Sequence, residues 1–153
     1  MIQEAAADEL IPLITSVPST NDIGSALEFI ERQHTRLRTG AGYSFAIADL
    51  ADAPVGQIGL WPTADKPDAA SIGYWIRPTA RNMGYASDAL ATLIVWARTL
   101  PHTRRLEIYV EPWNEGSWRV AEQSGFQRED LLRKWHPVGG VRRDMYRYTV
   151  NLR

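Results

Sequence analysis

The sequence contains no cysteine among its 153 residues. Disulfide bonds, thiolate metal ligands and cysteine nucleophiles are therefore excluded from its chemistry. The three histidines, His34, His102 and His136, are scattered along the chain, so we expect no metal site. No apolar run has the length of a membrane-spanning helix and no signal peptide is recognisable, which predicts a cytoplasmic protein without a membrane partner.

A strong excess of charge is missing as well, because the formal net charge is -1. Such a chain has no basic field to attract a phosphate backbone, so a nucleic-acid partner is not expected. Hydrophobic residues make up 44% of the sequence, which is typical of a soluble globular protein with ordinary charge density. We expect a single domain over residues 1–153.

Hydrophobic periodicity predicts a mixed succession of helices and strands. Helices are expected over residues 5–15, 22–38, 85–98 and 114–124. Strands are expected over residues 43–49, 55–61, 69–77 and 104–110, then from residue 126 and finally over 141–152. Three strands in a meander followed by crossover helices predict an α/β protein with a mixed sheet.

Two finer expectations concern the second helix and the loops. The apolar residues of that helix recur at a helical period and are expected to pack on the sheet: Ile23, Ala26, Leu27, Ile30 and Leu37. Segments 62–68 and 137–140 contain Pro, Asp or Gly and are expected to be loose segments at the mouth of a substrate site.

One segment carries a recognisable binding signal, Arg81-Asn82-Met83-Gly84-Tyr85-Ala86. It lies between the apolar run 72–76 and the start of a predicted helix. Unpaired N–H groups and the helix dipole favour anions at a helix N-terminus, and glycine removes the side chain that would block approach. The segment therefore predicts a cradle for a pyrophosphate.

A second segment, Asn114 to Phe126, begins with Asn-Glu-Gly-Ser and ends in Gly-Phe. In this order the two segments resemble the GNAT superfamily of acetyl-CoA-dependent N-acetyltransferases, whose cofactor loop reads Arg/Gln-x-x-Gly-x-Gly/Ala and whose later helix reads Asn-x-x-Ser/Ala. Residues 72–75, 111–117 and 142–146 narrow the resemblance to the branch of ribosomal-protein N-terminal acetyltransferases, the RimJ/RimL-like proteins. It covers most of the chain.

The resemblance implies the GNAT fold, with an antiparallel meander, crossover helices and two central strands that splay apart. Such proteins usually open with a strand, whereas this chain begins almost directly at the helical run 5–15. We therefore expect the first strand to be absent and one edge of the sheet to be uncovered.

The resemblance also implies that acetyl-CoA is the acetyl donor and that no metal is needed. Backbone groups of Trp75, Ile76 and Arg77 would contact the pantetheine arm and the acetyl carbonyl. The segment from Arg81 to Ala86 would wrap the pyrophosphate, with the Arg81 guanidinium as a charge-assisted partner. Asn114 would bond the pantetheine region, although an ordinary helix cap is the alternative.

The catalytic groups depart from the usual family pattern. The superfamily's general acid is a tyrosine seven residues beyond Asn114, a position occupied here by Ala121, and Ser117 is the substitute that the resemblance suggests. Many relatives carry a glutamate where this chain has Ser71. Glu107 and Glu111 are therefore the candidate bases, and a solvated charge is the alternative for each.

These features predict direct transfer of an acetyl group from acetyl-CoA to a primary amine in a ternary complex. A protein N-terminal α-amine is the acceptor that the resemblance favours. The alternatives are a small-molecule amine acetyltransferase and an acyl-CoA-binding module with impaired catalysis. A homodimer formed by pairing of the uncovered sheet edge is a further alternative.

Overall fold

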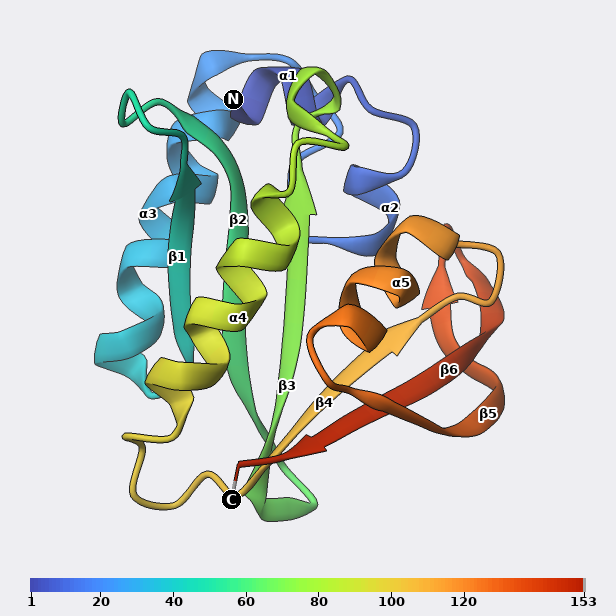
Figure 1. Ribbon diagram of the computed structural model, residues 1–153. Helices are drawn as coiled ribbons and strands as arrows, with labels where there is room; N and C mark the ends of the chain where they lie inside the picture. Colours follow the sequence, from blue (N-terminus) through green and yellow to red (C-terminus); the bar gives the residue numbers. More distant parts are fainter. Residues whose placement is uncertain (153) are drawn as a thin grey trace. The chain divides into compact units, whose positions relative to one another are not determined.

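The computed structural model describes residues 1–152 (Figure 1). Its elements follow one another as α1 (Ile2–Ala6), α2 (Ile11–Ile14), α3 (Ile23–Thr39), β1 (Tyr43–Ala48), β2 (Pro54–Thr63), β3 (Lys66–Ile76), the short 3₁₀ helix η1 (Pro78–Ala80), α4 (Tyr85–Ala97), β4 (Arg105–Val110), α5 (Glu115–Gln123), β5 (Gln127–Val138) and β6 (Val141–Asn151).

The six strands form one sheet in the order β1-β2-β3-β4-β6-β5. β3 and β4 are parallel, whereas β6 is antiparallel to both of its neighbours, so the predicted mixed α/β sheet is confirmed. The parallel ladder joins Ala69–Ile72 to Arg105–Ile108, while β3 continues to Ile76 and β4 to Val110. Within residues 1–152 no strand precedes α1, and β1 is a terminal strand of the sheet.

Residue contacts divide the chain into two compact units. The first unit contains Met1–Gly59 and Tyr74–Tyr85. The second contains Leu60–Gly73 and the residues from Ala86 onward. Neither unit is a continuous piece of the sequence, and the single domain expected from the chain length remains a prediction.

The start of the first unit differs from the predicted helix over residues 5–15. Two short helices, α1 and α2, replace it. Asp8 separates them, because its Oδ1 accepts hydrogen bonds from the N–H groups of Leu10 (3.0 Å) and Ile11 (2.9 Å). A side chain that satisfies the first N–H groups of one helix favours the end of the preceding one.

α3 lies along β1 in the first unit (Figure 1). Its bounds agree with the prediction to within one residue, whereas its buried face agrees only at Ala26. Ala26 and Phe29 are buried, whereas the predicted core residues Ile23, Leu27 and Leu37 are more than half exposed. Phe29, which removes a large apolar area from water, forms the buried face of the helix together with Ala26.

Gly56 of β2 lies against the backbone of Trp75 in β3. A Cβ atom added to Gly56 would lie 2.3 Å from the Trp75 carbonyl oxygen, and backbone atoms cannot move aside as a side chain does. We expect Gly56→Ala to lower the free energy of unfolding by about 1–3 kcal/mol. Chemical denaturation measures the change. Gly116→Ala, which adds its Cβ where no atom lies within 4 Å, is the matched control and should leave stability unchanged or raise it by up to about 1 kcal/mol, because alanine favours a helix more than glycine does.

The second unit contains two buried apolar rows that follow the expected periods. α4 buries Leu90, Leu93, Ile94 and Ala97 at helical spacing, and β4 buries alternate residues Leu106, Ile108 and Val110. β5 and β6 form a long hairpin, whose turn at Gly139 and Gly140 has φ angles of 57° and 80°.

Segment 62–68 is not the loose segment that its composition predicts. β2 continues to Thr63 and β3 begins at Lys66, so only residues 64 and 65 form a turn. Strand pairing in the sheet therefore overrides the local turn preference of Pro and Asp.

Candidate functional site

The loop from Arg81 to Ala86 connects η1 to the first turn of α4 in the structure, as predicted. Asn82 (φ 61°) and Gly84 (φ 85°) both have left-handed backbone conformations. Turns of this kind direct successive N–H groups toward one side and form anion-binding concavities. Met83 is exposed, and the first N–H groups of α4 have no partner within the helix by the geometry of an α-helix.

Two arginines lie at the start of this loop and just before it, and both are paired with carboxylates of the N-terminal segment. Arg81 Nη2 lies 2.7 Å from Asp8 Oδ2, and Arg81 Nε donates to the Ile76 carbonyl oxygen at 3.3 Å. Arg77 Nη1 lies 3.2 Å from Glu4 Oε2, while its buried Nε has no hydrogen-bond partner within residues 1–152. The glycine-containing turn and the helix start fit a pyrophosphate, whereas the two guanidinium groups are already paired with carboxylates.

The end of β3 offers fewer backbone groups to a ligand than the sequence suggests. The Arg77 N–H donates to the Val55 carbonyl of β2 (2.9 Å), and the Arg77 carbonyl accepts from Ala80 (3.0 Å). Because backbone groups alternate in direction along a strand, those of Trp75 also face β2, and those of Ile76 face the opposite edge. Among the three predicted residues, Ile76 is therefore best placed to offer a backbone group at that edge.

In the second unit, Asn114 caps α5. Its Oδ1 accepts a hydrogen bond from the Ser117 N–H at 3.3 Å. The ordinary cap is thus present, and it holds the Asn114 and Ser117 side chains at the same end of one helix. The structure brings these two predicted residues together, whereas Arg81 and Ile76 belong to the other unit.

Glu107 is completely buried, so the solvated charge considered for it from sequence is wrong. Its carboxylate accepts hydrogen bonds from Lys66 Nζ (2.7 Å), Arg105 Nε (3.2 Å) and the Tyr109 hydroxyl (2.5 Å). Burial alone would raise the pKa of this carboxyl, but the hydrogen bonds from Lys66, Tyr109 and Arg105 outweigh it and lower the pKa. Glu107 is therefore a stable carboxylate anion in the folded protein.

Tyr109 is a residue that sequence reasoning missed. Burial and the hydrogen bond to Glu107 raise its pKa to about 12, and its ring stacks on Trp135 with centroids 6.0 Å apart. The alternation Arg105, Glu107, Tyr109 was readable from the sequence as one face of a strand. The contact of Glu107 with Lys66 and that of Tyr109 with Trp135 were not readable, because these partners are distant in sequence.

Glu111, the other candidate base, follows β4 directly and is 8% exposed. Its Oε1 lies 3.9 Å from Arg143 Nε of β6, a longer contact than those of Glu107. The Glu111 carbonyl oxygen also accepts a hydrogen bond from the Asn114 N–H at 2.9 Å. Glu111 is therefore tied through the backbone to the cap of α5.

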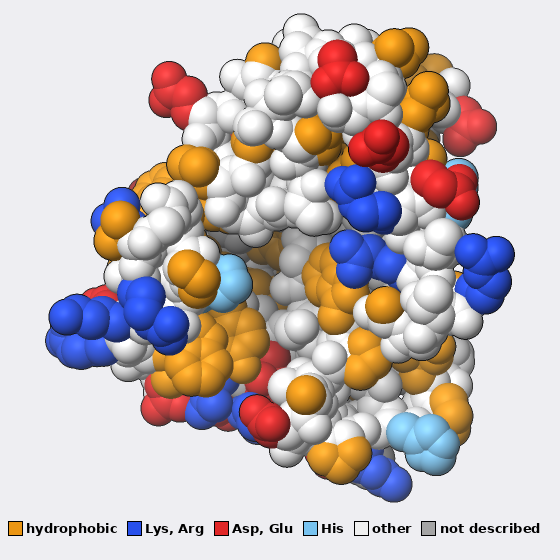
Figure 2. Space-filling model, turned by 180° about the vertical axis from the view of Figure 1, so that it is seen from behind, with side chains coloured by type: hydrophobic (Ala, Val, Ile, Leu, Met, Phe, Trp, Pro, Cys, Tyr) orange, Lys and Arg blue, Asp and Glu red, His pale blue; other side chains and the backbone are white. Residues whose placement is uncertain are grey.

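The β5–β6 hairpin carries a positive surface that the total charge conceals. Figure 2 shows Lys and Arg side chains gathered over this hairpin, where Arg133, Lys134, Arg142 and Arg143 are exposed. Trp135 lies between them in sequence and is 49% exposed.

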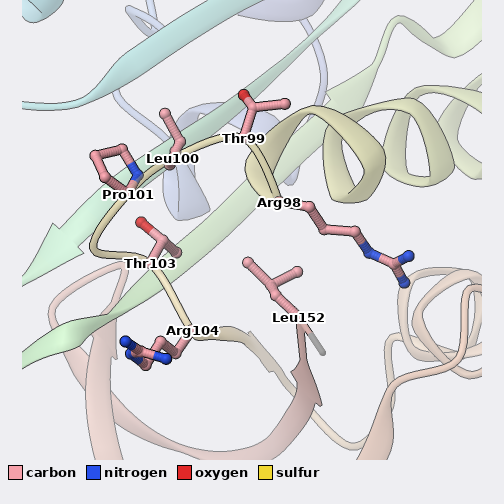
Figure 3. Close-up of a pocket in the computed structure, with 7 residues that line it drawn as sticks. All are labelled: Arg98, Thr99, Leu100, Pro101, Thr103, Arg104 and Leu152. Atoms are coloured by element: carbon pink, nitrogen blue, oxygen red, sulfur yellow. The ribbon is translucent and has the colours of Figure 1, made fainter.

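A pocket of about 220 Å³ lies in the second unit and is lined by Arg98, Thr99, Leu100, Pro101, Thr103, Arg104 and Leu152 (Figure 3). It is at the C-terminal end of α4, about 20 Å along the helix from Ala86. The side chains of Arg98 and Arg104 point in different directions, so they do not converge on one anion. None of the predicted site residues lines this pocket.

Residues 1–152 contain neither a helix suited to crossing a membrane nor a cluster of metal ligands. No helix there combines the length and the apolar character required to cross a membrane. No group of three or more His, Asp or Glu side chains in the same residues is arranged to hold a metal ion.

Comparisons with known proteins agree with the motifs. Residues 3–127 match the acetyltransferase (GNAT) domain family. The uncharacterised N-acetyltransferase p20 of Bacillus licheniformis is 26% identical over 145 residues, which are 94% of this chain and 82% of that protein.

Two solved structures are similar as well. A Vibrio cholerae protein assigned as a ribosomal-protein-serine acetyltransferase is 25% identical with a TM-score of 0.74, over 84% of this chain and 74% of the other. Mycobacterium smegmatis RimJ, solved with CoA-disulfide, is 28% identical with a TM-score of 0.77, over 86% of this chain and 63% of the other. The chain belongs to the GNAT family and is an acetyl-CoA-dependent N-acetyltransferase.

Proposed function

We propose that the protein acetylates the N-terminal α-amine of a polypeptide by direct attack of the amine on acetyl-CoA in a ternary complex. The observation that carries this acceptor class is the similarity to the Vibrio cholerae structure assigned as a ribosomal-protein-serine acetyltransferase. The motif pair of this chain, in its RimJ/RimL-like form, supports the same class.

We propose that acetyl-CoA is held mainly by backbone groups. The N–H groups from Asn82 to Ala86 bind the pyrophosphate, and the arginines at 77 and 81 add positive charge nearby. The backbone of Ile76 and the Asn114 side chain contact the pantetheine arm, whereas Trp75 and Arg77 contribute chiefly by fixing the end of β3. Bound there, acetyl-CoA supplies an activated thioester.

The proposed general acid is Ser117, whose hydroxyl donates a proton toward the departing thiolate. The proposed base is Glu111, which takes a proton from the acceptor ammonium directly or through water. Glu107 is the less suitable base of the two predicted glutamates, because its lowered pKa and three hydrogen-bond donors oppose proton uptake. We assign Glu107 the role of holding Tyr109 and the end of β4 in place.

Ser117→Ala should lower kcat by about 10- to 100-fold, because one proton transfer loses its donor. The affinity for acetyl-CoA should stay within about twofold of the parent value, since the Asn114 cap binds the backbone N–H of residue 117 and survives the change. Steady-state kinetics and calorimetry measure the two quantities. Ser124→Ala, at the other end of α5, is the matched control, and equal rates for the two variants would remove Ser117 from catalysis.

The acceptor is tested by mass spectrometry after incubation with acetyl-CoA and two sets of amines. One set contains peptides with free α-amines and the same peptides with blocked N-termini. The other contains polyamines, amino acids and amine antibiotics. A mass increase of one acetyl group only on free peptide N-termini is expected. Acetylation of small amines alone would establish the small-molecule alternative, and acetyl-CoA binding without any product would establish the binding module.

A further inference from the structure

Two carboxylates of the N-terminal segment hold the chain that leads into the cofactor loop. Asp8 uses both of its oxygens, since Oδ1 accepts from the N–H groups that begin α2 and Oδ2 pairs with Arg81 at 2.7 Å. Its side chain is only 10% exposed. Burial acts to raise the pKa of Asp8, but the hydrogen bonds from Ile11, Leu10 and Arg81 lower it, so the carboxylate stays charged.

Glu4 of α1 makes a similar set of contacts four residues earlier. Its Oε1 accepts hydrogen bonds from the Thr79 hydroxyl (2.7 Å) and the Thr79 N–H (3.1 Å). Its Oε2 pairs with Arg77 at 3.2 Å. The hydrogen bond from the Thr79 side chain is the main cause that lowers the pKa of Glu4. Together Glu4 and Asp8 hold residue 79 within η1 and residues 77 and 81 on either side of it.

The Arg81 side chain therefore binds two parts of the chain at once. Its Nη2 is bound to Asp8 and its Nε to the Ile76 carbonyl oxygen, so the side chain links the α1–α2 turn, the end of β3 and the start of the cofactor loop. A guanidinium fixed on two sides cannot also turn fully toward a pyrophosphate. Its bound position instead fixes the backbone just before Asn82 and Gly84, the two left-handed residues of the loop.

We propose that Asp8 and Glu4 are positioning residues for acetyl-CoA: acting through Arg81, Arg77 and Thr79, they hold the cofactor loop in its anion-binding conformation. This inference rests on the proposed function, because it takes the loop as the pyrophosphate site. It assigns Glu4 of α1 and Asp8, which precedes α2, a role in cofactor binding outside the motif at residues 81–86.

Electrostatics and positioning predict opposite signs for removal of a carboxylate. Acetyl-CoA is an anion, so loss of a nearby negative charge would by itself tighten binding. If the carboxylate positions the loop, its removal leaves the loop less ordered in the free protein. The loop must then be ordered when acetyl-CoA binds, and this entropic cost weakens binding. Weaker binding after neutralisation of Asp8 therefore distinguishes positioning from simple charge repulsion.

The test compares Asp8→Asn, Glu4→Gln and the parent by acetyl-CoA calorimetry, with Glu9→Gln as a control at an exposed carboxylate on the same segment. We expect about tenfold weaker binding for Asp8→Asn and a smaller loss for Glu4→Gln, as typical for loss of a charge-assisted hydrogen bond. Asp8→Asn should have little further effect in an Arg81→Gln background, because it acts through Arg81.

A second readout uses the protein without acetyl-CoA. Amide hydrogen exchange of residues 77–84 should become faster in Asp8→Asn and Glu4→Gln but not in Glu9→Gln. Unchanged or tighter binding together with unchanged exchange would overturn the inference. If either variant fails to fold, the other carries the test. A parent protein that binds acetyl-CoA while both variants match it refutes only the positioning role, whereas a parent that does not bind refutes the proposed cofactor site as well.

Discussion

Gly84→Glu is expected to weaken acetyl-CoA binding by at least about 100-fold, which corresponds to about 3 kcal/mol. Gly84 has a φ angle of 85°, a conformation that L-amino acids adopt only at a cost and glycine adopts freely. The new side chain would also place a carboxylate among the N–H groups that face the pyrophosphate. Calorimetry with acetyl-CoA measures the loss.

Gly40→Glu is the matched control for this variant. Gly40 caps α3 with a φ angle of 72°, and a Cβ atom there would meet nothing within 4 Å. The control therefore adds the same charge and a similar backbone cost away from the cofactor loop. If Gly84→Glu and Gly40→Glu bind acetyl-CoA equally well, the loop is not the cofactor cradle.

Glu107→Gln is expected to lower the free energy of unfolding by about 2 kcal/mol at neutral pH, because a fully buried carboxylate loses its pairing with Lys66 and Arg105. Both cations are partly exposed, which limits the cost of leaving them unpaired. Urea denaturation measures the change. Glu115→Gln removes the exposed pair with Arg119 on α5 and should change stability by less than about 0.5 kcal/mol.

The contribution of Glu107 to the free energy of unfolding should decrease as the pH falls. Its pKa is lower in the folded protein than in the unfolded chain, so its contribution is complete above the unfolded pKa of about 4.3. The contribution is lost as the pH falls through the folded pKa. The stability difference between the parent and Glu107→Gln should therefore shrink in acid, and a difference that grows as the pH falls would contradict this account.

The sequence predicted the elements of the sheet and the loop that precedes α4 because both have local signals. Alternating or continuous apolar runs mark the strands, and a glycine between strand and helix marks the loop. The face that the helix α3 buries was harder to predict. The aliphatic residues Ile23, Leu27 and Leu37 have a clear helical period, yet Phe29 faces the core and they do not.

The environment of the site residues could not be predicted in the same way. Period-two alternation places Glu107 opposite Leu106 and Ile108, but alternation alone cannot show what covers that face. Lys66, which pairs with Glu107, is 41 residues away in sequence. Arg81 pairs with Asp8, 73 residues away in sequence. The motif alone predicts that the Arg81 side chain binds the pyrophosphate, and it gives no sign of this pairing.

We propose that this chain binds acetyl-CoA by holding both the pyrophosphate and the pantetheine arm of the cofactor. Calorimetry on the parent chain with acetyl-CoA, desulfo-CoA and adenosine diphosphate tests it most directly. The account predicts micromolar affinity for acetyl-CoA, similar affinity for desulfo-CoA and much weaker binding of adenosine diphosphate, which lacks the arm. Absence of acetyl-CoA binding, or equal affinity for all three ligands, would contradict it.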